Sequence, residues 1–569
     1  MEKEFFRIEI CMKALIIICL IAVIGCIILL SCVPPVSRDA LAHHLAVPKL
    51  YLKHGSIYQI PDIEFSYYPM NLDLLYLIPL YFGNDIIPNF IHFSFALFTA
   101  ALIFNYLKKR ADILYALFGA GFFLSLPVIV KLSITAYVDL GLIFFSAASL
   151  LYLLKWAEQG FSLRFLFISA ICCGLALGTK YNGLIVLFLL TLFVPMIVLK
   201  FHFSTPELKC NFSTPEDSKK SQIYFIYKGS GYAAVFFIVA MAVFSPWMIR
   251  NYIWTGNPLF PMYDNWFNPK TAAEIADAPA RISHFVQRSI LYNESWWEIL
   301  LIPIRIFFQG QDDSVKYFDG KLNPLLFFLP FFAFLPRKEN RDTKIMTERK
   351  FLLAFAVLFL TFVFVRTDMR IRYAAPIIPP LVILSVLGLK EICTFLNTRY
   401  PATRGTLYKI ITITAVCAVM SMNAVYISDQ FGYVDPIPYI SGKISRDNYI
   451  GKYRPEYPVV RFINSSLPEN AKILCFFLGN RIYYSDREMI SDTEPFRKMI
   501  KAAESPEKIM YSLKQKGITH FLIRYDLFKQ WSGDNFESIE ARTVLDDFLK
   551  NHLKLRCDKG GYGLFELEK

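Results

Sequence analysis

The sequence predicts a polytopic α-helical membrane protein that ends in a small external α/β domain. Three observations predict this class. Of the 569 residues, 55% are hydrophobic and 19% are charged, whereas soluble domains average about 25% charged residues. Apolar runs of roughly the 20 residues that cross a bilayer recur over residues 1–428. Strand-like and helix-like runs alternate over residues 429–569, which we expect to form a separate domain.

Eleven apolar segments are expected to cross the membrane. One of them, at 323–336, is short for a crossing, and residues 296–308 form a candidate interfacial or re-entrant helix instead of a span. The predicted spans lie near residues 14–33, 88–107, 112–130, 137–154, 165–180, 183–199, 231–249, 323–336, 351–365, 373–389 and 410–428.

Charge in the connecting segments predicts the orientation. With a cytoplasmic N-terminus, the inner segments carry 23 Lys and Arg in 91 residues and the outer segments carry 15 in 149. The positive-inside rule therefore places the N-terminus in the cytoplasm and, after eleven crossings, the C-terminal domain outside. The net charge of +13 is then partly a topology signal, so no nucleic acid is expected as a partner.

The first apolar run is expected to be a signal anchor. It is too long for a typical cleavable signal, and Val33-Pro34-Pro35 follows where a small-residue cleavage site would lie. The eleven cysteines are scattered without a CxxC pair or a Cys/His cluster, so zinc and redox chemistry are not indicated. Cys475 is expected to be a buried free thiol rather than the disulfide partner of Cys557.

The tail contains no Gly-rich phosphate loop, and we expect it to act as a cap over an external cleft rather than as a separate enzyme. The predicted strands are Lys472–Leu478, Arg481–Ser485, Thr519–Arg524 and Gly563–Glu566, and the predicted helices are 494–504, 506–516 and 540–553.

Two carboxylates mark the outer face of the predicted bundle. Asp39 lies in the long first external loop (34–89), at the start of an expected amphipathic interfacial helix. Taken alone, Asp39 would be interpreted as the cap of that helix. Asp139 stands at the outer mouth of the fourth span, where a carboxylate facing lipid is costly, so it should face a cavity. Two acids at one face suit the proton handling of a transfer reaction.

Cations also gather at the outer ends of spans, against the positive-inside trend. Any single one could extend toward lipid headgroups. Together they predict binding of an anionic headgroup or a phosphate. These cations are Lys180, Arg250, Arg370 and Arg372.

Several motifs resemble a known family. Residues 37–45 (SRDALAHHL), followed by Pro48-Lys49-Leu50-Tyr51-Leu52 and Gly55, look like the first-loop signature of GT-C fold glycosyltransferases that use polyprenyl-phosphate sugars. Such enzymes include relatives of protein O-mannosyltransferase, aminoarabinose transferase and lipopolysaccharide core transferase. The resemblance covers nearly the whole chain, and it rests on the order of the motifs. Further matching segments are Tyr67-Tyr68-Pro69-Met70, residues 246–261 and Arg370-Ile371-Arg372-Tyr373.

The resemblance implies a role for each candidate residue. Asp39 corresponds to the first-loop catalytic carboxylate and would be the base that activates the acceptor, and Asp139 matches the second acidic position. The lipid phosphate would be held by Lys180, Arg250 and Arg372, and His43 and His44 would be possible contacts of the acceptor.

Two departures from the family pattern leave the sugar open. Ala40 follows Asp39 where many relatives carry a second acid, and no Lys stands beside Pro69 as it does in aminoarabinose-type enzymes. Strict mannosyl or aminoarabinosyl transfer is therefore not implied.

The expected reaction is inverting transfer from a polyprenyl-phosphate-sugar donor to a glycan, lipid or protein acceptor, by a multi-pass protein of a bacterial inner (plasma) membrane. The lipid phosphate is a built-in leaving group, so no nucleotide site is needed. The sequence implies no particular cofactor; a divalent metal is compatible with two carboxylates beside a phosphate, although no ligand cluster calls for one.

Two other classes of function remain open from the sequence. A lipid or sugar transporter or flippase would also be polytopic, but such proteins usually place polar groups near the midplane and often contain repeats, and we find none here. A non-catalytic assembly protein would leave Asp39, Asp139 and Lys180 without a role.

Overall fold

The structure is a computed structural model of the 569-residue chain. The predicted inner segments 200–228 and 337–350 lie partly outside the described residues, as does the end of the helix predicted at 494–504. The structure describes every residue except 1, 204–214, 270–281, 336–342, 401, 492, 503–504, 537 and 569.

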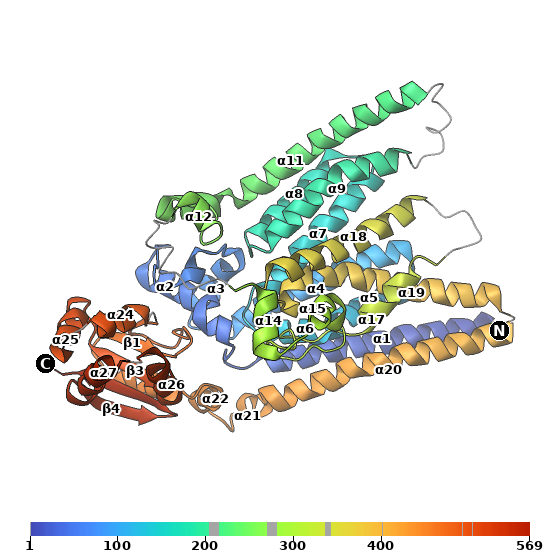
Figure 1. The fold of residues 1–569 in the computed structure, drawn as a ribbon. Coiled ribbons are helices and arrows are strands. Elements are labelled where there is room, and N and C mark those ends of the chain that lie inside the picture. The colour runs from blue at the N-terminus through green and yellow to red at the C-terminus, as the bar shows by residue number, and fades with distance from the viewer. Residues whose placement is uncertain are drawn as a thin grey trace.

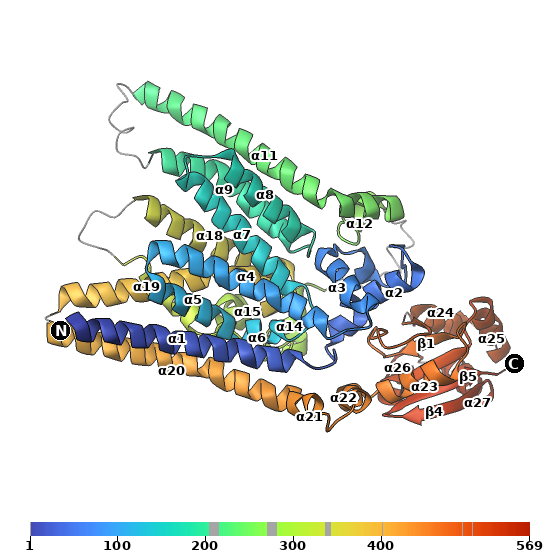
Figure 2. The same cartoon turned by 180° about the vertical axis from the view of Figure 1, so that it is seen from behind.

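Long apolar helices form the larger part of the molecule. In the described residues, seven helical segments are long and apolar enough to cross a membrane, or eight if the bent pair α5 (Ile113–Ser125) and α6 (Pro127–Ser133) forms one span. Figures 1 and 2 show α1 and α20 side by side although they come from opposite ends of this part. The seven segments lie in α1 (Glu2–Ser31), α4 (Ile87–Arg110), α7 (Asp139–Glu158), α9 (Gly183–Phe203), α11 (Pro215–Thr255), η3 with α19 (Ile371–Ile377, Ile378–Arg399) and α20 (Ala402–Val434).

The number of such helices is smaller than the eleven predicted. The predicted span 112–130 is broken before Pro127, where the chain bends by 64° because proline removes a helix hydrogen bond. Two other predicted spans are short helices, α8 (Leu163–Leu177) and α17 (Leu325–Phe332). The span predicted at 351–365 lies in α18 (Thr343–Arg366), whose first two turns carry charged residues.

Small polar residues join neighbouring helices inside the bundle. Ser149 of α7 donates to the carbonyl oxygen of Ser169 in α8 at 2.8 Å, and Ser169 donates back to the carbonyl of Ser149 at 2.6 Å. Such residues let helices approach closely in an apolar medium. At the opposite end from the first loop, Arg110 pairs with Glu348 at 2.8 Å and joins α4 to α18.

The first loop (34–89) folds into four short helices. They are η1 (Ala40–His44), α2 (Ala46–His54), η2 (Glu64–Tyr67) and α3 (Asn71–Tyr81). The prediction of one interfacial helix starting at Asp39 is wrong in two respects. The first turn is a π turn, closed by the Leu45 N–H on the Ala40 carbonyl at 2.9 Å. Leu41 and Leu45 are buried in protein, so the segment is enclosed and does not lie on the membrane surface.

A second irregular stretch connects α11 to α17. It contains α12 (Asp264–Phe267), α14 (His284–Tyr292), α15 (Trp296–Leu300) and α16 (Ile302–Arg305). The last two occupy the segment 296–308 that was predicted to be interfacial or re-entrant. Their few turns are too short to cross a bilayer.

The C-terminal domain follows α20 through α21 (Pro436–Ile440), α22 (Arg446–Tyr453) and α23 (Tyr457–Ser466). Its five-stranded sheet has the order β2-β1-β3-β5-β4. Strand β1 runs parallel to both of its neighbours, β2 and β3. Strand β5 runs antiparallel to both of its neighbours, β3 and β4. The remaining elements are β1 (Lys472–Phe476), β2 (Glu488–Ile490), β3 (His520–Arg524), β4 (Leu553–Lys559), β5 (Tyr562–Leu567), α24 (Glu494–Ala502), α25 (Pro506–Gln515), α26 (Tyr525–Asn535) and α27 (Ile539–Asn551).

Most sequence-predicted elements of this domain are present. The predictions of β1, β3, β5, α24, α25 and α27 are confirmed, and Cys475 is a buried free thiol in β1. The predicted strand Arg481–Ser485 is wrong, because this segment is a loop that contacts the first loop. The edge strand β4 was missed since most of its side chains are exposed and show no apolar alternation.

The C-terminal domain contacts the first loop through residues 483–486. Lys49 of α2 donates to the carbonyl oxygens of Tyr483 and Ser485 at 2.9 and 3.0 Å. The Tyr484 hydroxyl donates to the Pro35 carbonyl at 2.8 Å, and Arg446 pairs with Asp85. The domain thus lies against the segment that carries Asp39.

Candidate functional site

Asp39 immediately precedes the π turn η1, and its carboxylate faces Arg372. The side chain makes no capping hydrogen bond to the turn. Instead Oδ2 accepts from Arg372 Nη1 at 2.6 Å. Burial alone would raise the pKa of the Asp39 carboxyl, but the Arg372 guanidinium outweighs it and holds that pKa below its ordinary value. Asp39 is therefore a carboxylate at neutral pH, and the interpretation as a simple helix cap is wrong.

Asp139 and Lys180 form a second ion pair. Asp139 begins α7, and its Oδ1 accepts from Lys180 Nζ at 2.7 Å. The Asp139 side chain is 1% exposed and that of Lys180 is 19% exposed. Oδ2 of Asp139 is buried and has no hydrogen-bond partner among the described residues. Asp139 is therefore buried within the protein, but it is not among the residues that line the cavity containing Asp39, which differs from the prediction that it faces a cavity.

Tyr373 brings the two ion pairs together. Lys180 Nζ lies 5.2 Å and the Arg372 guanidinium 5.3 Å from the centre of its ring. The guanidinium also lies 5.5 Å from the ring of Tyr137. Cations over aromatic rings are stabilised without being neutralised. The structure therefore gathers four of the predicted site residues, Asp39, Asp139, Lys180 and Arg372.

The two histidines after Asp39 lie in the same cluster. His44 Nδ1 is 2.7 Å from Oδ1 of Asp73, a buried residue of α3. Burial lowers the pKa of His44 to about 3 and raises the pKa of Asp73 to about 7. Near pH 6 both groups are therefore neutral, and the contact is a hydrogen bond rather than an ion pair. His43 stacks on Phe65 with ring centres 4.4 Å apart, and its buried Nδ1 has no partner among the described side chains.

Two buried residues that position the cluster were missed from the sequence. The Leu140 N–H donates to His92 Nε2 at 2.9 Å, while His92 Nδ1 lies 2.8 Å from the Thr135 carbonyl. The ring of His92 thus satisfies a free N–H in the first turn of α7, beside Asp139. The second residue not predicted from the sequence is Asp73, which contacts His44. Each is a polar residue within an apolar stretch, which is a recognisable signal for a function in a membrane protein.

Close backbone approach brings α3 into the cluster. A Cβ at Gly178 would lie 2.1 Å from the Asn71 side chain, and the Asn71 N–H donates to the Gly178 carbonyl at 2.9 Å. A side chain at position 178 would displace the Asn71 amide, whose oxygen accepts from Trp247 Nε1 at 2.8 Å.

Arg250 lies apart from the four clustered residues. Its Nη2 donates to the Tyr67 carbonyl at 2.6 Å, and its guanidinium stacks 4.5 Å from Trp247 and 4.9 Å from Trp254. Asn251 bonds to the Tyr181 hydroxyl at 3.1 Å, which links this group to the residue after Lys180. Nη1 of Arg250 is buried and lacks a partner in the described part of the chain.

A cavity of about 450 Å³ opens on Asp39 and Arg372. Its charged lining residues are mostly cations, and tyrosines from α20 and α22 close one side. The lining includes Arg38, Asp39, Lys131, Asp313, Asp319, Arg370, Arg372, Tyr433, Tyr449, Tyr453 and Arg454. Among the residues that the structure describes, no group of three or more His, Cys, Asp or Glu side chains is arranged to hold a metal ion.

One protein family matches part of the sequence. Residues 62–251 match the dolichyl-phosphate-mannose-protein mannosyltransferase family. This segment contains Asp139, Lys180 and Arg250, whereas Asp39 and Arg372 lie outside it. No curated protein matches the chain.

Solved structures share the fold over almost the full length. ArnT from Cupriavidus metallidurans in the apo state is 12% identical, with a TM-score of 0.55 and 97% of each chain covered. The same protein bound to undecaprenyl phosphate is 13% identical, with a TM-score of 0.54 and the same coverage. Archaeal oligosaccharyltransferase AglB from Archaeoglobus fulgidus, in complex with an inhibitory peptide and a dolichol-phosphate, is 11% identical with a TM-score of 0.48, covering 91% of this chain and 70% of its own. The fold predicted from the resemblance is thereby confirmed by the likeness to ArnT, and residues 62–251 match a family of the predicted kind.

Proposed function

We propose that this chain transfers one sugar from a polyprenyl phosphate to an acceptor hydroxyl with inversion. The match of residues 62–251 to the dolichyl-phosphate-mannose-protein mannosyltransferase family supports this proposal. The observation that supports this most is the convergence of Asp39, Asp139, Lys180 and Arg372 from four separate elements. Transporters usually place their functional polar groups near the midplane of the membrane, whereas these residues lie at one end of the predicted spans.

Asp39 is the proposed base. Arg372 holds Oδ2, which leaves Oδ1 to accept the proton of the acceptor hydroxyl. The acceptor oxygen then forms its bond to the anomeric carbon as the bond from that carbon to the lipid phosphate oxygen breaks. The phosphate leaves with the bonding electrons, so no further co-reactant is needed.

Lys180, Arg372 and Arg250 are the proposed phosphate ligands. Fixed cations at a leaving phosphate stabilise the charge that develops there in the transition state. Lys180 and Arg372 lie on the ring of Tyr373, close to both carboxylates. Arg250 would contact the phosphate from the side of the lipid, because its buried Nη1 still has a hydrogen to donate. His43 and His44 are proposed contacts of the acceptor or the sugar.

The site is proposed to face the extracytoplasmic side, with the N-terminus in the cytoplasm and the domain 429–569 outside. The Lys and Arg bias of the connecting segments supports this orientation. The donor is then a lipid-linked sugar presented at the outer surface, and the acceptor is a glycan, lipid or protein.

The substitution Asp39→Asn tests the proposal. Asn keeps the size of Asp, so the purified variant should unfold at the parental temperature and still bind the lipid-linked donor. Sugar transfer should fall by about 10²–10⁴-fold, which is the usual contribution of a general base. Asp62→Asn, the same change at an exposed position of the same loop, should leave the rate unchanged. Transfer by Asp39→Asn at the parental rate would disprove the mechanism.

A further inference from the structure

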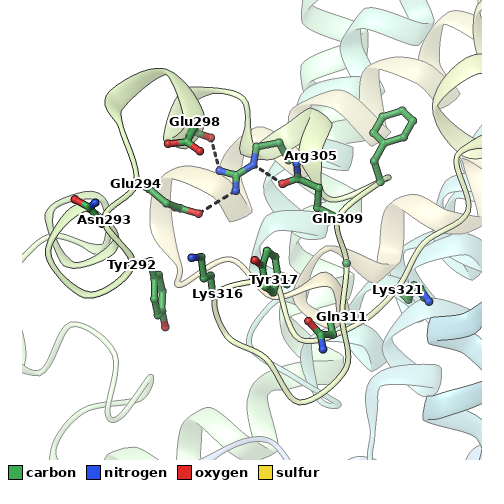
Figure 3. Close-up of a pocket in the computed structure, with 12 residues that line it drawn as sticks. Tyr292, Asn293, Glu294, Glu298, Arg305, Gln309, Gln311, Lys316, Tyr317 and Lys321 are labelled. Carbon is green, nitrogen blue, oxygen red and sulfur yellow. Dashed lines mark hydrogen bonds and ion pairs between the residues drawn. The ribbon is translucent and has the colours of Figure 1, made fainter.

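A second cavity lies in the stretch between α14 and α17, away from Asp39. It is a polar groove of about 660 Å³ (Figure 3). None of the predicted site residues lines it. Its lining residues are Tyr292, Asn293, Glu294, Glu298, Arg305, Phe308, Gln309, Gly310, Gln311, Lys316, Tyr317 and Lys321.

The floor of the groove is a rigid ion triad. Glu294 accepts from Arg288 at 2.6 and 2.9 Å and from Arg305 at 3.0 Å, and its carboxylate is almost fully buried. Arg305 also donates to the Gln309 side chain at 2.7 Å, and Figure 3 shows its guanidinium among these partners. The floor is therefore fixed before any ligand arrives, which lowers the entropy that binding would cost.

Two lysines add positive charge to the groove. Lys316 and Lys321 form no ion pair with any described residue. Each ammonium lies over an aromatic ring, at 5.7 Å from Tyr317 and 5.9 Å from Tyr426. Both carboxylates in the groove already have partners, since Glu298 accepts from the Ser295 hydroxyl at 2.7 Å. The lining holds three cations (Arg305, Lys316 and Lys321) and two carboxylates, so the net charge of the groove is positive and its ligand is expected to be an anion.

An exposed apolar face adjoins the groove. Trp296, Trp297 and Leu300 of α15 are 76, 52 and 60% exposed. Phe308 belongs to both features, because it lines the groove and is exposed beyond it. Tryptophan is enriched where protein meets the headgroup region of a bilayer, and short helices with one apolar face lie in that region. From these exposed side chains we expect the groove to open at the level of lipid headgroups, with an apolar surface beside it for acyl chains.

One segment separates this groove from the cavity of Asp39. Lys316 and Tyr317 line the groove, whereas Asp319 and Gly320 line the other cavity. The segment is packed closely against the residue before Arg372, because the Ile371 N–H donates to the Phe318 carbonyl at 2.8 Å.

We infer that this groove binds the phosphate-bearing headgroup of an anionic membrane lipid, whose chains lie along α15 and α16. The lipid is distinct from the sugar donor, since the groove is separated from Asp39 by the segment 311–321. Its phosphate is recognised by Lys316, which lies on the same side of the groove as Arg305 (Figure 3), while Lys321 adds positive charge at the opposite side. Binding of the lipid also stabilises the segment 311–321, whose Phe318 carbonyl accepts from the Ile371 N–H.

The test uses the full chain in nanodiscs of phosphatidylcholine with increasing phosphatidylglycerol, and measures retained phosphatidylglycerol by native mass spectrometry. The double variant Lys316→Gln/Lys321→Gln should bind the probe at least about tenfold more weakly than the parent, given the attraction of two lysines to an anionic lipid. The control Lys529→Gln/Lys550→Gln removes the same charge from exposed positions of the C-terminal domain and should bind as the parent does.

Two outcomes would overturn the inference. The first is equal binding by the parent and the Lys316/Lys321 variant. The second is displacement of the bound lipid by millimolar inorganic phosphate, which would assign the groove to a free anion. Asp39→Asn should retain phosphatidylglycerol normally, so failure of this inference and failure of the proposed reaction are separate results.

Discussion

The backbone N–H of Tyr483 donates to the carbonyl oxygen of Leu41 at 3.1 Å. This bond joins the C-terminal domain to the second residue after Asp39. Because Lys49 bonds the Tyr483 carbonyl from the other side, the loop 483–486 is held between two helices of the first loop. The C-terminal domain therefore contacts the segment of the proposed base directly, and its residues Tyr449, Tyr453 and Arg454 also line the cavity of Asp39.

Replacing Lys49 by Met should loosen this connection. The change removes hydrogen bonds to the Tyr483 and Ser485 carbonyls and to Asp486. We expect a loss of about 1–2 kcal/mol in the free energy of unfolding and a fall in kcat, measured on purified protein. Lys53→Met is the matched control, because Lys53 donates one bond, to the Asp486 carbonyl. Equal behaviour of the two variants would contradict this role of the domain.

The Asp139–Lys180 pair should show strong coupling in a double-mutant cycle. Lys180→Met leaves a buried carboxylate without its cation, which should cost about 3–5 kcal/mol of stability. Adding Asp139→Asn removes that charge and should restore most of the stability. Transfer activity should stay low in the double variant if both groups act in the reaction. Recovery of activity together with stability would show that the pair is structural.

The His44–Asp73 pair predicts a pH dependence of stability. Between about pH 4 and 6.5 the unfolded chain holds one proton of the pair, on His44. The folded chain also holds one, on Asp73, since the pKa of Asp73 is raised to about 7 and the pKa of His44 is lowered to about 3. The pair therefore contributes no slope in this window.

Asp73→Asn should reveal the contribution of His44 by itself. The folded variant then holds no proton at this site while the unfolded chain still protonates His44. Its free energy of unfolding, relative to the parent, should rise with pH by up to about 1.4 kcal/mol per unit until pH 6.5. Thermal unfolding of both proteins in detergent at several pH values measures this difference. A constant difference across the window would contradict the proposed protonation of the pair.

The orientation can be tested with reporters. A reporter fused after Tyr439 should be active only outside the cytoplasm, and one inserted near residue 219 only inside, because the intervening segments follow the positive-inside bias. Activity of both reporters on one side would refute the orientation proposed for the site.

The membrane class and the clustered residues were accessible from the sequence for physical reasons. Charged groups beside lipid are costly, so Asp139 and Lys180 at a span end were recognisable as residues that face inward. Asp39 was recognisable by its motif. The pairing of Asp39 with Arg372 was not predictable, since Arg372 follows Asp39 by 333 positions and no local pattern encodes such a contact.

Local patterns also misled in identifiable places. The apolar run at Pro127 has the composition of a span, yet the chain bends there. The segment Arg481–Ser485 has the composition of a strand, but its tyrosines are used in contacts with Leu41, Pro35 and Asp85. At Pro127 a single proline outweighed the helix propensity of the apolar run. In Arg481–Ser485 tertiary contacts outweighed the strand propensity of the tyrosines.

The π turn Ala40–His44 has a consequence for insertions and deletions. A π turn holds one residue more than an α turn, and each residue advances a helix by about 100°. Asp39 lies before this turn, and His44 lies at its end. Deleting one of the small residues between them, Ala40 or Ala42, would restore α geometry and rotate Asp39 out of phase with His44 and Arg372. The length of this turn is therefore expected to tolerate change less well than its side chains do, and a gap of one residue here would separate active from inactive versions of the chain.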